Sequence, residues 1–306
     1  MKKTLLFLAA ISIAVAANAK ILRVSNVPGS SAPYTSIDAA HDAASAGDTI
    51  MVDGSSLKYG GNKGEYNITK KLVIIGPGYW LVENDVIEEG SSSAYIYNLN
   101  LKAEGIVVKG MEIWKLNVHN AQAVINRCKI DYINFGSGAD NGVVCQCYIT
   151  EHVYGNETNY IQITNNIFTS VTGMAGDYIF NSLYNSLISY NTFRHRKVPF
   201  SHINNSTIEH NILNEVSFYS CSSNSFNDNY KTDIISTQAT KDFIDSDYYN
   251  LEIPEEVTSK YGAFAGDSPY ILSGVPSGPV IQDLVVPTTV EMGTKMNVTI
   301  KVGMIK

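Results

Sequence analysis

A short phrase of strand length recurs seven times between residues 105 and 230, and this repeat limits the fold more than any other feature. When the seven phrases are aligned with one another, one position forms a column of mostly small or amide residues. An apolar residue stands three positions before this column in every phrase, and another stands two positions after it until Lys231 ends the series. A phrase that returns about every twenty residues with this pattern is typical of one coil of a β-solenoid. The column contains Met111, Cys128, Cys147, Asn166, Asn191, Asn211 and Asn229.

Stacking of the coils brings the members of each column together. Parallel strands lie about 4.8 Å apart, so the apolar columns form the core, and an asparagine column hydrogen-bonds its amides along the stack. Cys128 and Cys147 fit the same column as small buried side chains. Their stacking distance also allows a disulfide, which is the alternative to two free thiols.

The segment YTSIDAAHDAASAGDTIMVDGS predicts a helix before the first coils. Thr35 and Asp38 have the spacing of a capping box, and Gly47 is placed to end the helix before a strand over 49–52. A helix here covers the open end of the stack, which would otherwise expose unpaired strand edges. The following YNITKKLVIIGPGYW predicts two strand segments joined by a turn.

The first residues, MKKTLLFLAAISIAVAANAK, have the pattern of a secretory signal peptide over 1–19 with cleavage after Ala19. The alternative, an N-terminal membrane anchor, is disfavoured because the apolar run is short for a bilayer. We therefore expect a secreted or periplasmic protein without a membrane span after signal cleavage.

The composition excludes some classes of partner. A net charge of −7 and a pI near 5.4 argue against non-specific nucleic-acid binding, which needs a basic surface. Charged residues make up only 17% of the chain, and 23 Gly and 19 Tyr favour β structure with frequent turns. The four cysteines lack zinc-ligand spacing.

The run from Tyr34 to Tyr79, with SIDAAHDAASAGDTIMVDG and LVIIGPGY, resembles the opening of secreted bacterial proteins of the pectin-lyase-like superfamily. The later NNIF and YNTF phrases resemble the coils of that superfamily. The resemblance implies an all-β fold, a single right-handed parallel β-helix over 20–279 with an N-terminal capping helix. Residues 268–279 would form a covering loop, and 280–306 a short β tail or the remnant of an accessory module. We expect a monomer.

The resemblance makes polysaccharide the first substrate class to consider. Hydrolases of this fold need paired carboxylates, and lyases need a cation and a base. The paired-Asp and NTD phrases, the Asp-rich calcium phrases and the Arg-Pro-Arg loop are all missing from the sequence. No catalytic residue can therefore be transferred by motif, and the sequence favours a protein that is not an enzyme.

A cluster of cations stands in LISYNTFRHRKVPF, over 187–200. Counting along the coils places Arg194 in one column with Trp114 and Asp131, and His195 in the next with Tyr132, Glu151 and Glu215. One interpretation is a groove that binds glycan, because the planar guanidinium of arginine hydrogen-bonds carboxylates and aromatic rings offer their faces to sugar rings. If the groove is catalytic, His195 is the base, and Arg196 or Lys197 neutralises the substrate. The other interpretation is an exposed ladder of ion pairs with little net energy. The predicted ligand-binding residues are Arg194, Arg196, Glu151, Glu215, Asp131, Trp114 and Tyr132.

The segment DFIDSDYYN groups Asp242, Asp245 and Asp247. These carboxylates could hold Ca²⁺, but no calcium-loop spacing matches, and a solvated acidic loop is the simpler interpretation. No other cofactor or metal is expected. The leading hypothesis is an exported, carbohydrate-associated protein that binds polysaccharide or cell-surface glycan. The alternatives are a polysaccharide lyase or glycoside hydrolase acting on an acidic glycan, and a structural or adhesin-like surface protein.

Overall fold

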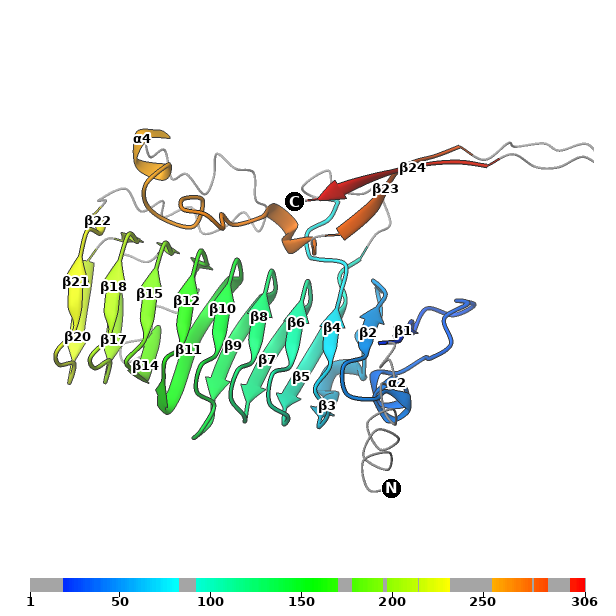
Figure 1. Cartoon of the computed structure of the whole chain (residues 1–306), viewed down its shortest axis with the longest axis horizontal. Coiled ribbons are helices and arrows are strands. Elements are labelled where there is room, and N and C mark those ends of the chain that lie inside the picture. The colour runs from blue at the N-terminus through cyan, green and yellow to red at the C-terminus, as the bar shows by residue number, and fades with distance from the viewer. Residues whose placement is uncertain are drawn as a thin grey trace, which may run out of the picture.

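The protein is described by a computed structural model over residues 19–82, 92–169, 178–194, 197–213, 215–231, 255–276, 278–285 and 298–305. Residues 1–18 of the predicted signal peptide lie outside these ranges. The chain is predominantly β, with few helices and two long sheets of parallel strands, as an all-β parallel solenoid requires (Figure 1). Within the described ranges, none of the helices has the length and apolar character needed to cross a membrane.

The first sheet, sheet A, takes one short strand from each coil, and all its neighbouring strands are parallel. Its strands in spatial order are β1 (Ile21–Val24), β2 (Thr49–Val52), β4 (Val73–Ile75), β6 (Val107–Lys109), β8 (Val124–Asn126), β10 (Val143–Cys145), β12 (Gln162–Thr164), β15 (Leu187–Ser189), β18 (Thr207–Glu209) and β21 (Ser225–Asn227).

The second sheet, sheet B, has long strands only from β5 to β11 and divides into two branches beyond β11. The main path is β3 (Glu65–Ile68), β5 (Tyr95–Leu101), β7 (Glu112–Val118), β9 (Lys129–Phe135), β11 (Tyr148–Asn159), β13 (Ile167–Phe168), β16 (Thr192–Phe193), β19 (Ile212–Leu213) and β22 (Tyr230–Lys231). The branch is β14 (Phe180–Tyr184), β17 (Lys197–Ser201) and β20 (Glu215–Tyr219).

Strand register confirms both predicted apolar columns. In sheet A, Ile125 pairs with Val108 on one side and Val144 on the other. In sheet B, Ile130 pairs in the same way with Ile113 and Ile149. All six side chains are buried in one continuous core that extends along the stack. The two predicted strand segments after the helix also form, as β3 and β4.

Left-handed backbone at fixed positions produces the corners on either side of sheet A. In each of seven coils, one such residue lies two positions before the sheet A strand and a second lies one position after it. Only the first of these coils uses glycine, so the other positions carry a backbone conformation that costs L residues energy. The pairs are Gly105 and Gly110, Gln122 and Arg127, Asn141 and Gln146, Tyr160 and Asn165, Asn185 and Tyr190, Asn205 and His210, and Ser223 and Asp228.

The predicted asparagine ladder follows the second of these corners. Oδ1 of Asn191 accepts hydrogen bonds from the backbone N–H and the side-chain amide of Asn166, both at 3.0 Å. Asn211 serves Asn191 in the same way, at 2.8 and 3.0 Å, and Asn229 serves Asn211. Asn166, Asn191 and Asn211 are fully buried. Each amide therefore supplies hydrogen-bonding partners to backbone groups that water cannot reach.

Two cysteines continue this ladder with sulfur in place of the amide. The backbone N–H of Cys147 donates to Oδ1 of Asn166 at 2.8 Å, and that of Cys128 donates to Sγ of Cys147 at 3.5 Å. Sγ of Cys147 donates to the carbonyl of Ile125 at 3.6 Å, a position that corresponds to the carbonyl bound by each ladder amide. All four cysteines of the chain are described, and all are free thiols.

Helix α2 (Ile37–Ala43) lies beside the first strands (Figure 1), and its apolar side joins the core. Its N-cap is Ser36, whose Oγ accepts the N–H of Ala39 at 3.2 Å. The predicted capping box at Thr35 was thus wrong by one residue, because either hydroxyl has the chemistry of a cap and only the backbone path selects between them.

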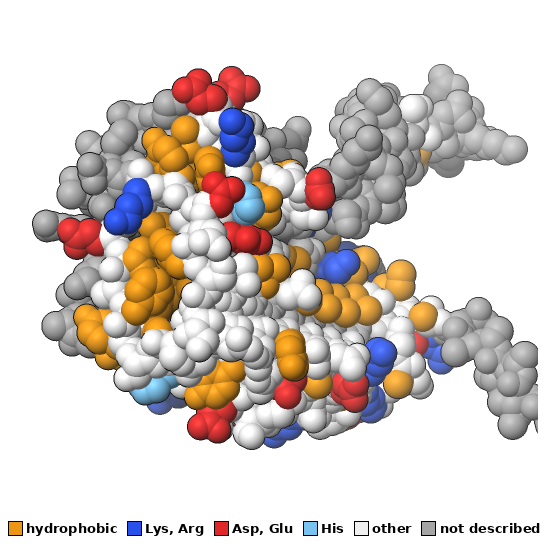
Figure 2. Space-filling model, turned by 60° about the vertical axis from the view of Figure 1, so that its left-hand side comes forward, with side chains coloured by type: hydrophobic (Ala, Val, Ile, Leu, Met, Phe, Trp, Pro, Cys, Tyr) orange, Lys and Arg blue, Asp and Glu red, His pale blue; other side chains and the backbone are white. Residues whose placement is uncertain are grey.

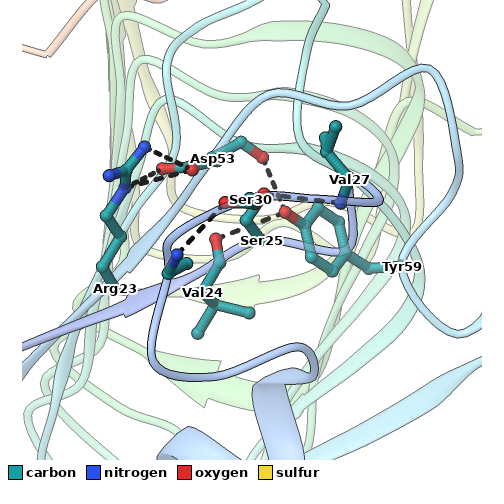
Figure 3. A network of polar contacts seen from close by, with 8 residues as sticks. Arg23, Val24, Ser25, Val27, Ser30, Asp53 and Tyr59 are labelled. Carbon is teal, nitrogen blue, oxygen red and sulfur yellow. Dashed lines mark hydrogen bonds and ion pairs between the residues drawn. The ribbon is translucent and has the colours of Figure 1, made fainter.

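An arginine fixes the first strand to the second coil (Figure 3). Nε of Arg23 donates to both carboxylate oxygens of Asp53, at 2.9 and 3.1 Å, and Nη2 lies 2.8 Å from Oδ2. The hydroxyl of Tyr59 donates to the carbonyl of Asp53 at 2.8 Å. This Arg–Asp pair is solvent-exposed and joins strands within the fold, so we assign it a structural role.

Residues 261–276, called here the C-terminal strap, run back along the outside of the solenoid after the short helix α4 (Glu255–Thr258) (Figure 1). The strap covers an apolar strip of sheet B that includes Tyr148 and Ile167. One residue from each of several corners binds it: His210 accepts the N–H of Gly262 (2.8 Å), Asn165 donates to Ala265 (2.7 Å), Gln146 to Pro269 (2.6 Å) and Arg127 to Val275 (2.9 Å).

Two short 3-10 helices, η1 (Gly61–Lys63) and η2 (Leu272–Gly274), complete the described helical segments. At the C-terminus, β23 (Gly278–Val285) and β24 (Thr299–Ile305) form a separate two-stranded antiparallel sheet. The predicted tail over 280–306 contains most of this pair.

Asn191→Ala tests the ladder. The change removes the acceptor of two donors of Asn166 and the donor to the buried carbonyl of Ile163, so we expect unfolding to become easier by about 2–4 kcal/mol. Asn191→Cys should cost less than Asn191→Ala, since a thiol already serves this column. Urea unfolding measures both.

The matched control is Asn120→Ala, which removes an exposed amide bonded to one carbonyl and should change stability by less than about 0.5 kcal/mol. Equal losses at Asn191 and Asn120 would show that the ladder does not stabilise the fold.

Candidate functional site

Five rings form a continuous series on the outer side of β5, β7, β9 and β11 in sheet B, called here the ring column, although it shifts sideways by one residue between Trp114 and Tyr132. The predicted binding residues Trp114 and Tyr132 are adjacent in it, with centroids 5.3 Å apart and planes at 72°. Tyr97 stacks on Trp114 at 4.3 Å, and His152 follows Tyr132 at 4.9 Å. Tyr154 stacks on His152 at 3.6 Å. All five rings are half-buried, so each keeps part of its surface in contact with solvent.

Sequence reasoning missed Tyr97, His152 and Tyr154. The spacing could have revealed Tyr97, which stands 17 residues before Trp114, as Met111 stands 17 before Cys128. The prediction that Glu151 lies beside Tyr132 was wrong, because the register pairs His152 with Tyr132. One extra residue in β11, between Ile149 and His152, shifts every later side chain by one position.

A column of amides runs beside the rings on the same strands. Nδ2 of Asn117 donates to Oδ1 of Asn100 at 2.8 Å, and Nδ2 of Asn134 donates to Oδ1 of Asn117 at 3.3 Å. Asn100 in turn donates to Oδ1 of Asn67 at 3.1 Å. The flanking Leu116 and Val118 are buried, which places the amide between them on the outer side. We call the ring and amide columns together the aromatic–amide face.

Two oppositely charged groups at the edge of this face, Glu112 and Lys129, form an ion pair. Nζ of Lys129 lies 2.7 Å from Oε1 of Glu112, and Ser93 donates to Oε2 of the same carboxylate at 2.5 Å. Lys129 also lies 4.8 Å from the ring centre of Trp80. These contacts fix Glu112 and Lys129 to each other and to the protein surface.

Asp131, a predicted binding residue, lies next in line on β9 and is half-buried. Burial raises the pKa of its carboxyl above the ordinary value, although a 2.6 Å hydrogen bond from Oγ1 of Thr150 acts in the opposite direction. The carboxylate is therefore held close to the protein at some electrostatic cost.

Arg194, the first residue of the basic cluster, lies at a distance from the predicted rings. Arg194 follows β16, where its backbone N–H donates to the carbonyl of Phe168 at 2.9 Å, and its side chain is half-buried. Trp114 belongs to the same outer column but lies four coils away, about 19 Å along the stack. Rings and arginine thus share one side of the solenoid without forming one compact pocket.

Glu215 lies beside another residue of the basic cluster than the one predicted. Lys197 begins β17, and exposed Glu215 pairs in register with it, not with His195 as predicted. Two more residues separate the ladder from the strand in the coil of Asn191 than in the next coil, which shifts the register. His195 and Arg196 lie outside the described residues, so their predicted roles stay predictions.

His210 stacks on Tyr190 at 4.8 Å, and its Nε2 lies 3.0 Å from Oδ2 of Asp228. Among the described residues, no three His, Cys, Asp or Glu side chains are arranged to hold a metal ion. The predicted calcium candidates Asp242, Asp245 and Asp247 lie outside that part of the chain.

Comparison of the chain with family models, with curated proteins and with solved structures found no match in any of the three. The fold and the aromatic–amide face are therefore the only basis for describing the protein. It is a parallel β-solenoid that presents adjacent columns of rings and amides on one outer side.

Asp131→Asn tests the electrostatic cost at this edge. The raised folded-state pKa means that the folded protein binds a proton more readily than the unfolded chain, so wild-type stability falls as pH rises through that pKa. The amide can still accept the Thr150 hydrogen bond without burying a charge.

We therefore expect the variant to be more stable than wild type at pH 7, with the difference shrinking as pH falls toward about 4. Urea unfolding at both pH values measures this. A variant less stable at pH 7 would show that the ionised carboxylate is stabilising.

Proposed function

We propose that this protein is an exported, right-handed parallel β-helix protein of the pectin-lyase-like kind that binds a carbohydrate polymer through the aromatic–amide face. The signal-peptide pattern over 1–19 supports export to the periplasm or the medium. The coil phrases and the parallel sheets support the β-helix over 20–279, with α2 covering its N-terminal end.

The pairing of a ring column with an amide column carries the proposal. Sugars combine apolar C–H surfaces with many hydroxyl groups, so a glycan site needs rings for the first and hydrogen-bonding groups for the second. Trp114 and Tyr97 supply the ring surface that their mutual stacking leaves open, and Asn117 and Asn134 supply amides that both donate and accept. A face of this length suits a polymer better than a single sugar.

Binding suits this face better than cleavage. Glycoside hydrolysis requires one carboxyl group as acid and another as base or nucleophile. Glu112 and Asp131 at the face are engaged by Lys129 and Thr150, and Glu65 accepts a hydrogen bond from Asn100, as expected of groups that shape a surface. The protein in this proposal acts as a monomer and needs no cofactor.

Trp114→Ala should weaken retention on the polysaccharide that the protein binds. Loss of one stacked ring costs about 1 kcal/mol, or roughly fivefold in affinity. Affinity electrophoresis in gels that contain neutral or acidic polysaccharides measures the shift. Unsaturated products and reducing ends, followed in parallel, would reveal a lyase or hydrolase instead.

Tyr160→Ala is the matched control, because Tyr160 is an exposed ring (58%) just before sheet A and away from the face. Its loss should leave retention unchanged. Equal effects of the two substitutions, or retention that is insensitive to both, would contradict glycan binding at the aromatic–amide face.

A further inference from the structure

We infer that the polymer on the aromatic–amide face is a neutral, extended glycan of the β-1,4-linked kind, lying along the solenoid with one sugar on each coil. The inference rests on the proposed function, and it specifies the charge, linkage and direction of the bound chain. Four properties carry it: the repeat of the face, the straightness of the stack, the hydrogen-bonding groups of the face and its charge.

The coils of β5, β7 and β9 each carry one ring and one amide of the face, and β11 continues the rings with His152. Along the column, ring centres are 4.3 Å apart from Tyr97 to Trp114, 5.3 Å from Trp114 to Tyr132 and 4.9 Å from Tyr132 to His152. These steps follow the strand spacing of about 4.8 Å. A β-1,4-linked chain advances by nearly this length for each sugar, so successive sugars would meet one ring on each of these four coils.

The shape of the stack also favours an extended ligand. The coils of sheets A and B follow one another in a nearly straight row (Figure 1). A straight ribbon of β-1,4-linked sugars can keep contact along such a row. A helical α-linked chain turns away from it after a few units and loses the register.

The amide column retains hydrogen-bonding capacity for hydroxyl groups. A side-chain amide has two N–H groups and a carbonyl oxygen with two lone pairs. In the ladder, Asn117 uses one N–H toward Asn100 and one lone pair toward Asn134. Asn117 can therefore still donate once and accept once, which matches a hydroxyl group that does both.

The charges on the face do not suit a polyuronate. The outer sides of β7 and β9 carry Glu112, Lys115, Lys129 and Asp131, which cancel. The adjacent β5 has no charged residue, and β11 adds the acidic Glu151 and Glu157. A uronate on each coil would need a cation on each coil. Figure 2, which brings the end of the stack at β20–β22 forward, shows acidic and basic side chains scattered among uncharged ones there too.

The test is calorimetric titration of the purified protein with oligosaccharides of two to eight sugars. The probes are β-1,4-linked glucose and N-acetylglucosamine oligomers, α-1,4-linked glucose oligomers and oligogalacturonates. We expect a neutral β-1,4 series to bind at least tenfold more tightly than the other two classes. Its affinity should rise with each added sugar until the chain spans the four coils of the ring column, at about four sugars, and then level off.

Asn117→Lys tests the amide column directly. The lysine should weaken the neutral series at least fivefold and strengthen oligogalacturonate binding. The matched control is Asn120→Lys, which adds the same charge at an exposed asparagine outside the face and should change neither. Unfolding temperatures confirm that both variants fold, and Asn117→Ala replaces Asn117→Lys if the lysine prevents folding.

The outcomes separate this inference from the proposed function. Tighter binding of oligogalacturonate or α-linked oligomers, or affinity independent of length, overturns the inference, while the proposed function stands if Trp114→Ala still weakens that binding. A protein that binds none of the probes and no polysaccharide fails both.

Discussion

Hydrogen bonding between successive coils is the interaction on which this structure depends. Every coil must turn sharply at the corners of sheet A, and six coils do so with left-handed residues other than glycine. The energetic cost of these left-handed residues is tolerable because the adjacent column of asparagines and cysteines hydrogen-bonds the buried backbone groups. The side chain of Asn191 accepts a hydrogen bond from the backbone N–H of Asn166 and donates one to the carbonyl of Ile163, and both partners belong to the preceding coil. The thiol of Cys147 makes the corresponding contacts, so the column selects hydrogen-bonding geometry and not amide chemistry alone.

Regular stacking inside imposes a regular surface outside. Because each coil repeats at the strand spacing, any outward residue type that recurs becomes a column about 4.8 Å apart. One side of sheet B, near Tyr148, is closed by the C-terminal strap. The side that carries Trp114 and Asn117 presents rings and amides outward, and this contrast locates the proposed site.

Counting residues from coil to coil predicted the strand partners correctly wherever the repeat was uninterrupted, and it failed where a coil changed length. Val108, Ile125 and Val144 pair as counted from the sequence. Glu151 and Glu215 do not, because residues are added between the ladder and the next strand segment. Insertions of one or two residues leave no compositional mark, and only backbone register shows where they are absorbed. The ring column was only partly predicted from the sequence for the same reason, since the extra residue in β11 places His152 beside Tyr132.

The sequence alone determined that the chain stacks strand-sized phrases, which residues fill the core and that an amide column supports the corners, because these depend on short-range periodicity. Tertiary structure alone decided that Arg127 binds the strap, that Arg194 and Trp114 lie far apart on one side, and that Asn100, Asn117 and Asn134 form an outer ladder beside the rings. Those facts depend on how coils of unequal length superimpose, and superposition is a property of the folded stack.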